Sequence, residues 1–339
     1  MNNKLGQSFD KVIDNLNIDK LMILKQLPDD IKYDAQEIRF RINAPIMVVC
    51  KSSQYFIFDS GKASVIPGTG MLITTKKDME TIFASLCEFS VHSYENEINC
   101  GYITIKGGHR AGICGTAVTD NNIIKNIRDI SSINLRISRQ IFGCADGVIN
   151  LLKNNMHGLI IAGPPACGKT TILRDTARQI ASGALGKIYR VAIADERGEI
   201  AAIFRGIPQN DLGYACDCLD SYPKHIAIDH AVRCLSPKII ICDEIGTSEQ
   251  VEAVSQGFNS GVLFIISVHA SNKLELQKRP VVKSLINTGA FENIIMLCSS
   301  DTPGKIKEIY KAGDLYENCR NNAYNNILHY DSCTPCQYI

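Results

Sequence analysis

Neither sign of charge dominates this sequence, and it lacks any long hydrophobic run. Lysine and arginine number 36 and aspartate and glutamate 35, so the formal net charge of +1 gives no whole-chain reason to expect nucleic acid or an anionic membrane as partner. No run of about 18 consecutive apolar residues occurs, so no membrane-spanning helix is predicted. The start of the chain, Met1–Lys4, also lacks the apolar stretch of a signal peptide. These absences predict a cytoplasmic protein that does not insert directly into a membrane.

Fourteen cysteines are present, but their spacing does not form a zinc pattern. Two close pairs occur, Cys216/Cys218 and Cys333/Cys336. A structural zinc site needs about four ligands at suitable spacing, so zinc is the less favoured interpretation of both pairs, and more so of the first. Cysteines inside apolar runs are expected to pack as small hydrophobic residues. These are Cys50, Cys87, Cys242 and Cys298.

The first part of the chain mixes helix and strand signals. Residues 8–27 carry apolar side chains near a 3.6-residue period, which predicts a helix. Residues 37–42 alternate apolar and charged, as a half-buried strand does, and Thr75 followed by Asp78 resembles a capping box that opens another helix. Further short strands are expected at 46–50, 55–58, 102–105, 110–119 and 133–137. These features predict a smaller α+β domain over residues 1–145.

From residue 158 onward, unbroken apolar strands alternate with helices. Such strands indicate a parallel sheet covered on both faces, so an α/β core is predicted over residues 146–312. Residues 313–339, rich in Asn and Tyr, show no period and are interpreted as a disordered tail. Strands are expected at 158–162, 189–194, 239–242 and 262–268, and helices at 169–182, 224–234 and 248–258.

One segment between a predicted strand and a predicted helix fits the pattern G-x-x-x-x-G-K-[ST]. Backbone N–H groups of such a loop surround phosphates, and the helix N-terminus adds positive potential. Lys169 would contact the β and γ phosphates of ATP, and Thr170 would bind Mg²⁺ through its hydroxyl. The nucleotide-binding residues predicted here are Gly163, Pro164, Pro165, Ala166, Cys167, Gly168, Lys169, Thr170, Thr171 and His269.

Acidic residues follow two of the predicted core strands. Asp243 and Glu244 end the strand 239–242, where Asp243 would orient the Mg²⁺ shell and Glu244 would activate the attacking water. Glu196 follows another strand, and side chains at the carboxyl ends of parallel strands converge. The alternatives are an acidic pair that caps a strand end and a solvated charged turn. The predicted catalytic residues are Glu244, Glu196 and Lys169, and the predicted metal ligands are Thr170, Asp243 and Glu196.

Two further features lie near the fourth predicted strand of the core. His269 ends the strand 262–268 and would sense the γ-phosphate, or else be a satisfied polar residue at a strand end. The segment Asn272–Glu275 nearly matches the guanine-reading N-K-x-D pattern, but it has glutamate where aspartate is required. This mismatch favours ATP over GTP.

Together these residues give the chain a family resemblance: over residues 35–310 it resembles the stage III sporulation protein AA family, bacterial ATPases related to type II and type IV secretion motors. The resemblance implies an N-terminal domain followed by a RecA-like P-loop core. It also implies a ring, expected to be a hexamer, docked on integral-membrane proteins of a sporulation stage III complex on the mother-cell side of the forespore membrane. The matching stretches are Glu37–Arg41, Gly101–Thr104, Gly107–Gly112, Ile127–Ser132, Gly163–Thr170, Asp195–Arg197, Gly206–Gln209, Asp243–Gly246 and Lys278–Pro280.

The chain departs from the family at a few positions. Ala215 and Thr247 occupy positions where arginine is usual, and Ala166 stands where glycine is common, while Lys169 and the acidic residues remain. Motors of this kind hydrolyse between subunits, with an arginine of one protomer at the γ-phosphate of the next. Two other functions stay open: a nucleic-acid-dependent RecA-like ATPase, and a nucleotide-gated assembly factor with little turnover. The candidate arginines are Arg128, Arg136 and Arg139, which are favoured, and Arg205 and Arg233.

Overall fold

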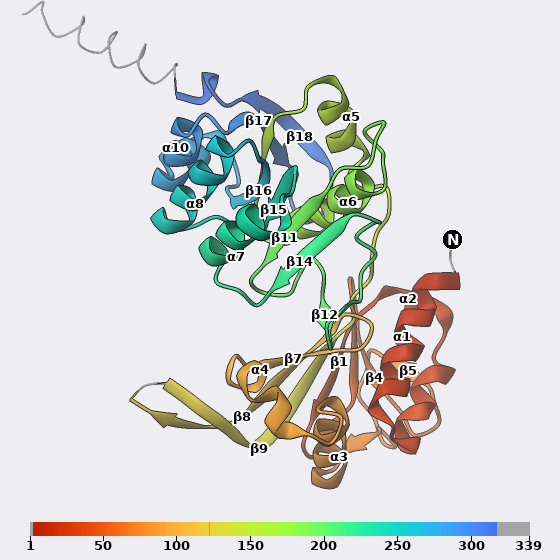
Figure 1. The fold of residues 1–339 in the computed structure, drawn as a ribbon. Helices are drawn as coiled ribbons and strands as arrows, with labels where there is room; N and C mark the ends of the chain where they lie inside the picture. Colours follow the sequence, from red (N-terminus) through yellow and green to blue (C-terminus); the bar gives the residue numbers. More distant parts are fainter. Residues whose placement is uncertain (1–2, 122, 317–339) are drawn as a thin grey trace, which may run out of the picture. The chain divides into compact units, whose positions relative to one another are not determined.

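The computed structural model describes residues 3–121 and 123–316 and divides into two compact units (Figure 1). The first unit comprises residues 1–140 and 202–210, and the second comprises 141–201 and 211–339. The chain therefore passes between the units three times, whereas the sequence analysis expected one boundary near residue 145. Each unit has its own hydrophobic core.

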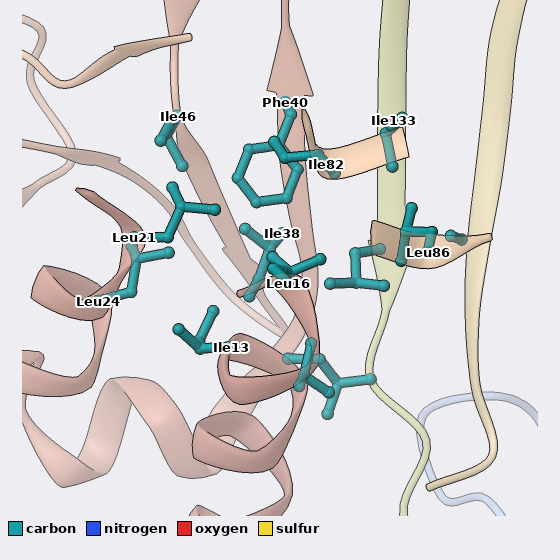
Figure 2. Packing of buried hydrophobic residues seen from close by; sticks show 14 of the residues in the cluster. Ile13, Leu16, Leu21, Leu24, Ile38, Phe40, Ile46, Ile82, Leu86 and Ile133 are labelled. Atoms are coloured by element: carbon teal, nitrogen blue, oxygen red, sulfur yellow. The ribbon is translucent and has the colours of Figure 1, made fainter. Parts of the chain in front are cut away.

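The N-terminal helix predicted over 8–27 is interrupted in the structure. Helix α1 spans Asn3–Leu16, and a 3₁₀ helix, η1, spans Asp19–Gln26. Between them Asn17 adopts a left-handed conformation with φ of 50°, which asparagine tolerates better than most residues and which ends the first helix. The apolar period still predicts the buried face correctly, because Leu16, Leu21 and Leu24 are all buried against the sheet (Figure 2).

A seven-stranded antiparallel sheet forms the centre of the first unit, in the order β5-β4-β3-β1-β9-β8-β7. The alternation predicted from the sequence is confirmed in β1, where Ile38 and Phe40 are fully buried and Arg39 and Arg41 are half-buried. Figure 2 shows Ile38 and Phe40 among the side chains of the helices that cover this sheet. The strands are β1 Ala35–Arg41, β3 Met47–Cys50, β4 Gln54–Ile57, β5 Ala63–Ser64, β7 Tyr102–Ile105, β8 His109–Asp120 and β9 Ile123–Arg136.

The remaining elements of this unit are short, apart from one capped helix. The predicted capping box is confirmed: the Thr75 hydroxyl accepts the N–H of Asp78, and the Asp78 carboxylate accepts the N–H of Thr75. This box opens α3, Lys76–Leu86. The others are α2 Asp29–Asp34, η2 Val91–Tyr94, α4 Glu95–Asn99 and the paired β2 Ala44–Pro45 and β6 Ile73–Thr74.

Strands β8 and β9 continue beyond the sheet as a two-stranded ribbon (Figure 1). From Cys114 to Asp120 the side chains of β8 are exposed. The sequence analysis predicted only 133–137 for the second strand, whereas β9 begins at Ile123 and pairs with the exposed end of β8. Of the described side chains in this added stretch, only Ile127 and Ile130 pack against the core, so it lacks the strict alternation from which strands are predicted.

Residues 202–210 form a small hairpin, β12 Ile203–Phe204 and β13 Ile207–Pro208, that belongs to the first unit rather than to the predicted core. The Gln209 side chain accepts the N–H of Gly107 at 2.8 Å. Gly108 has φ of 75°, and a Cβ there would lie 3.1 Å from the Cβ of Ala202, so this approach requires glycine. These contacts join positions about 100 residues apart, which no local sequence pattern reveals.

The second unit contains a seven-stranded sheet in the order β14-β11-β15-β16-β10-β17-β18. All neighbouring strands are parallel except β17 and β18, which are antiparallel. The predicted α/β core with a parallel sheet is therefore confirmed, with an antiparallel edge strand added. The strands are β10 Gly158–Gly163, β11 Val191–Asp195, β14 Cys216–Asp220, β15 Ile239–Cys242, β16 Leu263–His269, β17 Phe291–Leu297 and β18 Ile306–Lys311.

Helices cover the faces of this sheet (Figure 1). Ile228, Val254 and Leu285 bring α7, α8 and α10 into one buried cluster with alternate residues of the central strands, such as Ile160 and Ile240. The central strands β10, β11 and β15 are buried along their whole length, which explains their unbroken apolar runs. The helices are α5 Asp146–Asn154, α6 Lys169–Ala181, α7 Lys224–His230, which continues as a π-helix over Ala231–Leu235, α8 Ser248–Asn259, α9 Lys273–Lys278 and α10 Pro280–Asn287.

Of the predicted tail 313–339, only residues 313–316 lie in the described part of the chain. There Leu315 is fully buried in the core of the second unit, so ordered packing extends past the predicted boundary. The Cys333/Cys336 pair lies outside the described residues. In residues 3–121 and 123–316, no helix combines the length and apolarity needed to cross a bilayer.

Candidate nucleotide-binding site

The predicted P-loop connects the carboxyl end of β10 to the first turn of α6. Gly168 precedes the helix with φ of 93°, and a Cβ there would lie 3.0 Å from the backbone nitrogen of Gly304. A Cβ on Gly163 would lie 2.5 Å from the Cys167 sulfur. Both positions therefore require glycine. Ala166 also has positive φ, 58°, a conformation that costs a non-glycine residue roughly 1 kcal/mol.

The Lys169 ammonium lies inside this loop. Its Nζ donates to the carbonyl oxygens of Gly163 at 3.0 Å and Pro164 at 2.8 Å, and it lies 3.1 Å from His269 Nδ1. Burial lowers the pKa of Lys169 below its ordinary value. The structure thus brings together two residues predicted for the phosphate site: Lys169 at the start of α6 and His269 at the end of β16.

Thr170 and Asp243 are joined by a direct hydrogen bond. The Thr170 hydroxyl donates to Asp243 Oδ2 at 2.9 Å, and the Ser267 hydroxyl donates to Asp243 Oδ1 at 2.5 Å. A hydroxyl and one carboxylate are the kind of set that Mg²⁺ uses, since it takes one or two carboxylates and completes its shell with phosphate oxygens and water. Among the described residues, no group of three or more His, Cys, Asp or Glu side chains could hold a metal by itself. The donors present fit a Mg²⁺ ion that arrives with a nucleotide.

Glu244 follows Asp243 in a strained backbone conformation, with φ of 42°. Its N–H donates to Ser267 Oγ at 3.0 Å. Its carboxylate faces two cationic or titratable groups: Oε2 lies 3.3 Å from the Arg197 guanidinium, and Oε1 lies 3.6 Å from His269 Nε2. Strained residues of this kind gather at functional sites, where surrounding contacts hold them in place.

The acidic loop after β11 has a structural residue and an outward-facing one. Asp195 is buried and accepts the N–H groups of Glu199, Ile200 and Ala201, so it shapes the loop. Burial raises the pKa of Asp195 to about 6, although these N–H groups oppose the shift. Glu196 lies beside Lys224, with Oε2 3.5 Å from Nζ. No hydrogen bond or ion pair found in the described residues joins Glu196 to Thr170 or Asp243, so its metal role stays a prediction.

Three further residues bond to the loops of the candidate site, and the sequence analysis did not propose them. Ser267 binds both Asp243 and the Glu244 backbone, Lys224 binds the Glu244 carbonyl oxygen at 2.8 Å, and Arg174 donates to the carbonyl oxygens of Glu199 and Ile200 at 2.6 and 2.8 Å. Arg174 and Lys224 are buried charges in helices. For Arg174 and Lys224 the sequence offered one signal, a basic residue on the apolar face of a helix. Such a residue is buried only when it has a partner, so its position indicates that a partner lies nearby.

The candidate trans-acting arginines differ in what they contact. Arg139 donates to the carbonyl oxygens of Lys32 and Ala35, so its guanidinium is already engaged inside the first unit. Arg205 pairs with Glu88, Arg233 pairs with Asp229 at 2.8 Å, and Arg136 lies 3.7 Å from Glu37. Arg128 is exposed and lies 3.8 Å from Asp129.

The near-match to a guanine-reading motif has a local explanation. The Asn272 side chain accepts the N–H of Glu275 and caps α9, and the Lys273 ammonium lies over the ring of Tyr310. Both side chains are thus engaged within the second unit. The segment acts as a helix start.

Comparisons with solved structures agree with the fold described above. The structure is similar to that of the Legionella pneumophila ATPase DotB, with a TM-score of 0.51 at 13% identity over 86% of this chain and 84% of that one. It is also similar to the pilus retraction motor PilT with bound ADP, with a TM-score of 0.55 at 16% identity over 86% and 85%. At these identities the likeness concerns the fold, which is that of a RecA-like P-loop core preceded by a smaller α+β unit.

The sequence relationship is more specific. The stage III sporulation protein AA of Bacillus subtilis (strain 168) is 35% identical over 289 residues, which cover 85% of this chain and 90% of that protein. The family model described as "Sporulation stage III, protein AA" matches residues 10–315. Since this match takes in both units, including the P-loop and the acidic strand ends, the chain belongs to the stage III sporulation protein AA family.

Proposed function

We propose that this protein binds and hydrolyses ATP with Mg²⁺. The observation that carries the proposal is the 2.9 Å hydrogen bond between Thr170 and Asp243, formed beside Lys169 at the start of α6. A hydroxyl, a carboxylate and an ammonium meet there at the end of a glycine-bounded loop, which is the set that Mg²⁺ and a triphosphate require. The fold likeness to the ATPase DotB and to the pilus retraction motor PilT with bound ADP supports the same activity.

Each residue of the site then has a defined task. The loop N–H groups and Lys169 bind the phosphates, and Lys169 exchanges its bonds to the Gly163 and Pro164 carbonyls for phosphate oxygens. Thr170 and Asp243 hold Mg²⁺, which neutralises phosphate charge when bound. Glu244 accepts a proton from a water whose oxygen attacks the γ-phosphorus. The bond from that phosphorus to the β–γ bridging oxygen breaks, and ADP and phosphate are released.

The cellular role we propose is that of a motor in a secretion-like complex of sporulation. The family relationship supports a role at stage III, and the similarity in fold to DotB and PilT supports a motor. The expected partners are integral-membrane proteins of that complex, which would recruit the protein to the mother-cell side of the forespore membrane. Their binding is expected to stimulate turnover.

Steady-state ATP hydrolysis by the purified protein tests this function. We expect phosphate release that stops when EDTA removes Mg²⁺ and that rises when the membrane-protein partners are supplied in detergent or vesicles. Single-stranded DNA or RNA serves as the control, because the near-neutral charge gives no electrostatic reason for stimulation. Stimulation by nucleic acid alone would instead support the RecA-like alternative. ATP binding without turnover under all conditions would support a nucleotide-gated assembly factor.

A ring is the expected working form. An arginine that one protomer places at the γ-phosphate of the next stabilises the transition state, so such motors gain most of their turnover on assembly. Light scattering at micromolar concentration should therefore show a larger species with ATP and Mg²⁺ than without, a hexamer being expected. Arg128→Ala should lower turnover without weakening ATP binding, and Arg190→Ala, which removes a bond from an exposed arginine to the Ser236 carbonyl in the second unit, serves as its control. Full activity in a strictly monomeric protein would contradict the ring.

A further inference from the structure

Lys224 is a buried cation at the first residue of α7. Its side chain is 6% exposed. A positive charge at a helix N-terminus is unfavourable, because the helix dipole is positive at that end. Burial of an ammonium costs free energy as well, unless the group is paired. A buried lysine at the start of a helix therefore needs partners that compensate for both costs.

The partners of Lys224 belong to two different loops of the candidate site. Its Nζ donates to the backbone carbonyl oxygen of Glu244 at 2.8 Å, in the loop after β15. The same Nζ lies 3.5 Å from Glu196 Oε2, in the loop after β11. Strands β11 and β15 are neighbours in the sheet, so both loops leave the same edge. One ammonium therefore ties together the two acidic strand ends.

The backbone of Glu244 is held on both sides of its side chain. Its N–H donates to Ser267, which also donates to Asp243, and its carbonyl oxygen accepts from Lys224. Between these two bonds the residue has φ of 42°, a conformation that is unfavourable for a non-glycine residue and persists only when neighbours impose it. If the Lys224 bond were lost, Glu244 could relax and its carboxylate would change direction.

We propose that Lys224 is a positioning residue that holds Glu244 in its strained conformation and so aims the carboxylate at the reacting water. This inference rests on the proposed ATPase function. Lys224 acts through the Glu244 backbone, so its loss should lower the rate of the chemical step and leave ATP binding largely intact. A displacement of about 1 Å at a catalytic group can lower a rate by about 100-fold.

Lys224→Met tests the idea, because methionine keeps much of the side-chain length and removes the charge and the donor. We expect kcat to fall by about 10- to 100-fold, with the Kd for ATP changed by less than about threefold. Lys224→Arg, which keeps both charge and donor, should recover part of the activity. The matched control is Lys238→Met. Lys238 directly precedes β15, at the end of the strand opposite to Glu244, and its side chain donates to the Gly261 carbonyl.

The decisive measurement is the double variant with Glu244→Gln. Residues that act as a unit are non-additive, so Lys224→Met should lower kcat little further once Glu244 is already replaced. A full additional loss in that background, or an unchanged kcat in the single variant, would overturn the positioning role while leaving the ATPase itself established. A wild-type protein without turnover would overturn both proposals. If circular dichroism shows that Lys224→Met does not fold, Lys224→Gln takes its place. Its side chain is uncharged and one bond shorter than that of lysine, so kcat should fall by a smaller factor, and this loss should likewise be non-additive with that of Glu244→Gln.

Discussion

Replacing Lys169 with alanine is expected to weaken ATP binding by about 100-fold or more. The ammonium is the one cation bonded within the P-loop in the described structure, and its Nζ lies among the Gly163 and Pro164 carbonyls and His269. A triphosphate bound there would lose its central counter-charge, and removal of one partner of a buried charge pair costs about 3–5 kcal/mol. Part of this loss of binding free energy is offset. In the wild-type protein Lys169 must break its bonds to the Gly163 and Pro164 carbonyls before it can bind a phosphate, whereas the variant has no such bonds to break.

Isothermal titration calorimetry with ATP and Mg²⁺ measures the change directly. Lys153→Ala is the matched control, because Lys153 is exposed on α5 in the same unit. Circular dichroism and thermal melting should accompany the titration, since Lys169 also bridges loop carbonyls in the folded protein. A folded Lys169→Ala protein that binds ATP with wild-type affinity would remove this lysine from the site.

Glu244→Gln is expected to lower turnover by about 10²- to 10⁴-fold, the usual range for loss of a general base. Glutamine keeps the size of the side chain, and the backbone bonds to Ser267 and Lys224 do not involve the carboxylate. The ion pair with Arg197 is exposed and contributes little to stability, so the variant should fold normally. ATP affinity should stay within about threefold of wild type, because the phosphate-binding loop is unchanged.

Single-turnover hydrolysis and ATP titration, performed together, separate these two effects. Glu252→Gln is the control, since Glu252 is an exposed acid on α8 of the same unit. Trapped ATP in the Glu244→Gln protein would agree with a catalytic role downstream of binding. Wild-type turnover would transfer that role to Glu196 or Glu199.

The sequence by itself was sufficient where structure follows from local pattern. The apolar strands and intervening helices of the second unit were predicted because burial on both faces of a parallel sheet requires unbroken apolar runs. The P-loop was predicted because glycine spacing, the lysine and the following hydroxyl are contiguous in the chain. The capping box at Thr75 and Asp78 was likewise local, since both bonds span three residues.

Other features were decided only by tertiary structure, because they depend on residues far apart in the chain. The hairpin at 202–210 belongs to the first unit through contacts with Gly107 and Gly108, about 100 residues away. The break at Asn17 does not disturb the apolar period of residues 8–27, so the period could not reveal that the helix is interrupted there. The antiparallel edge strand β18 is largely exposed and carries no alternation.

The candidate site divides in the same way. Lys169, Thr170, Asp243 and Glu244 could be named from the sequence, because each stands at a strand end or helix start that its own segment predicts. That Arg139 is held by carbonyls of the first unit, and that Lys224 reaches the Glu244 backbone, depended on the packing of helices and strands against one another. A motif identifies the residues that can contact a ligand, whereas the bonds that hold those residues in position come from other segments of the chain, and only the folded structure brings these segments together.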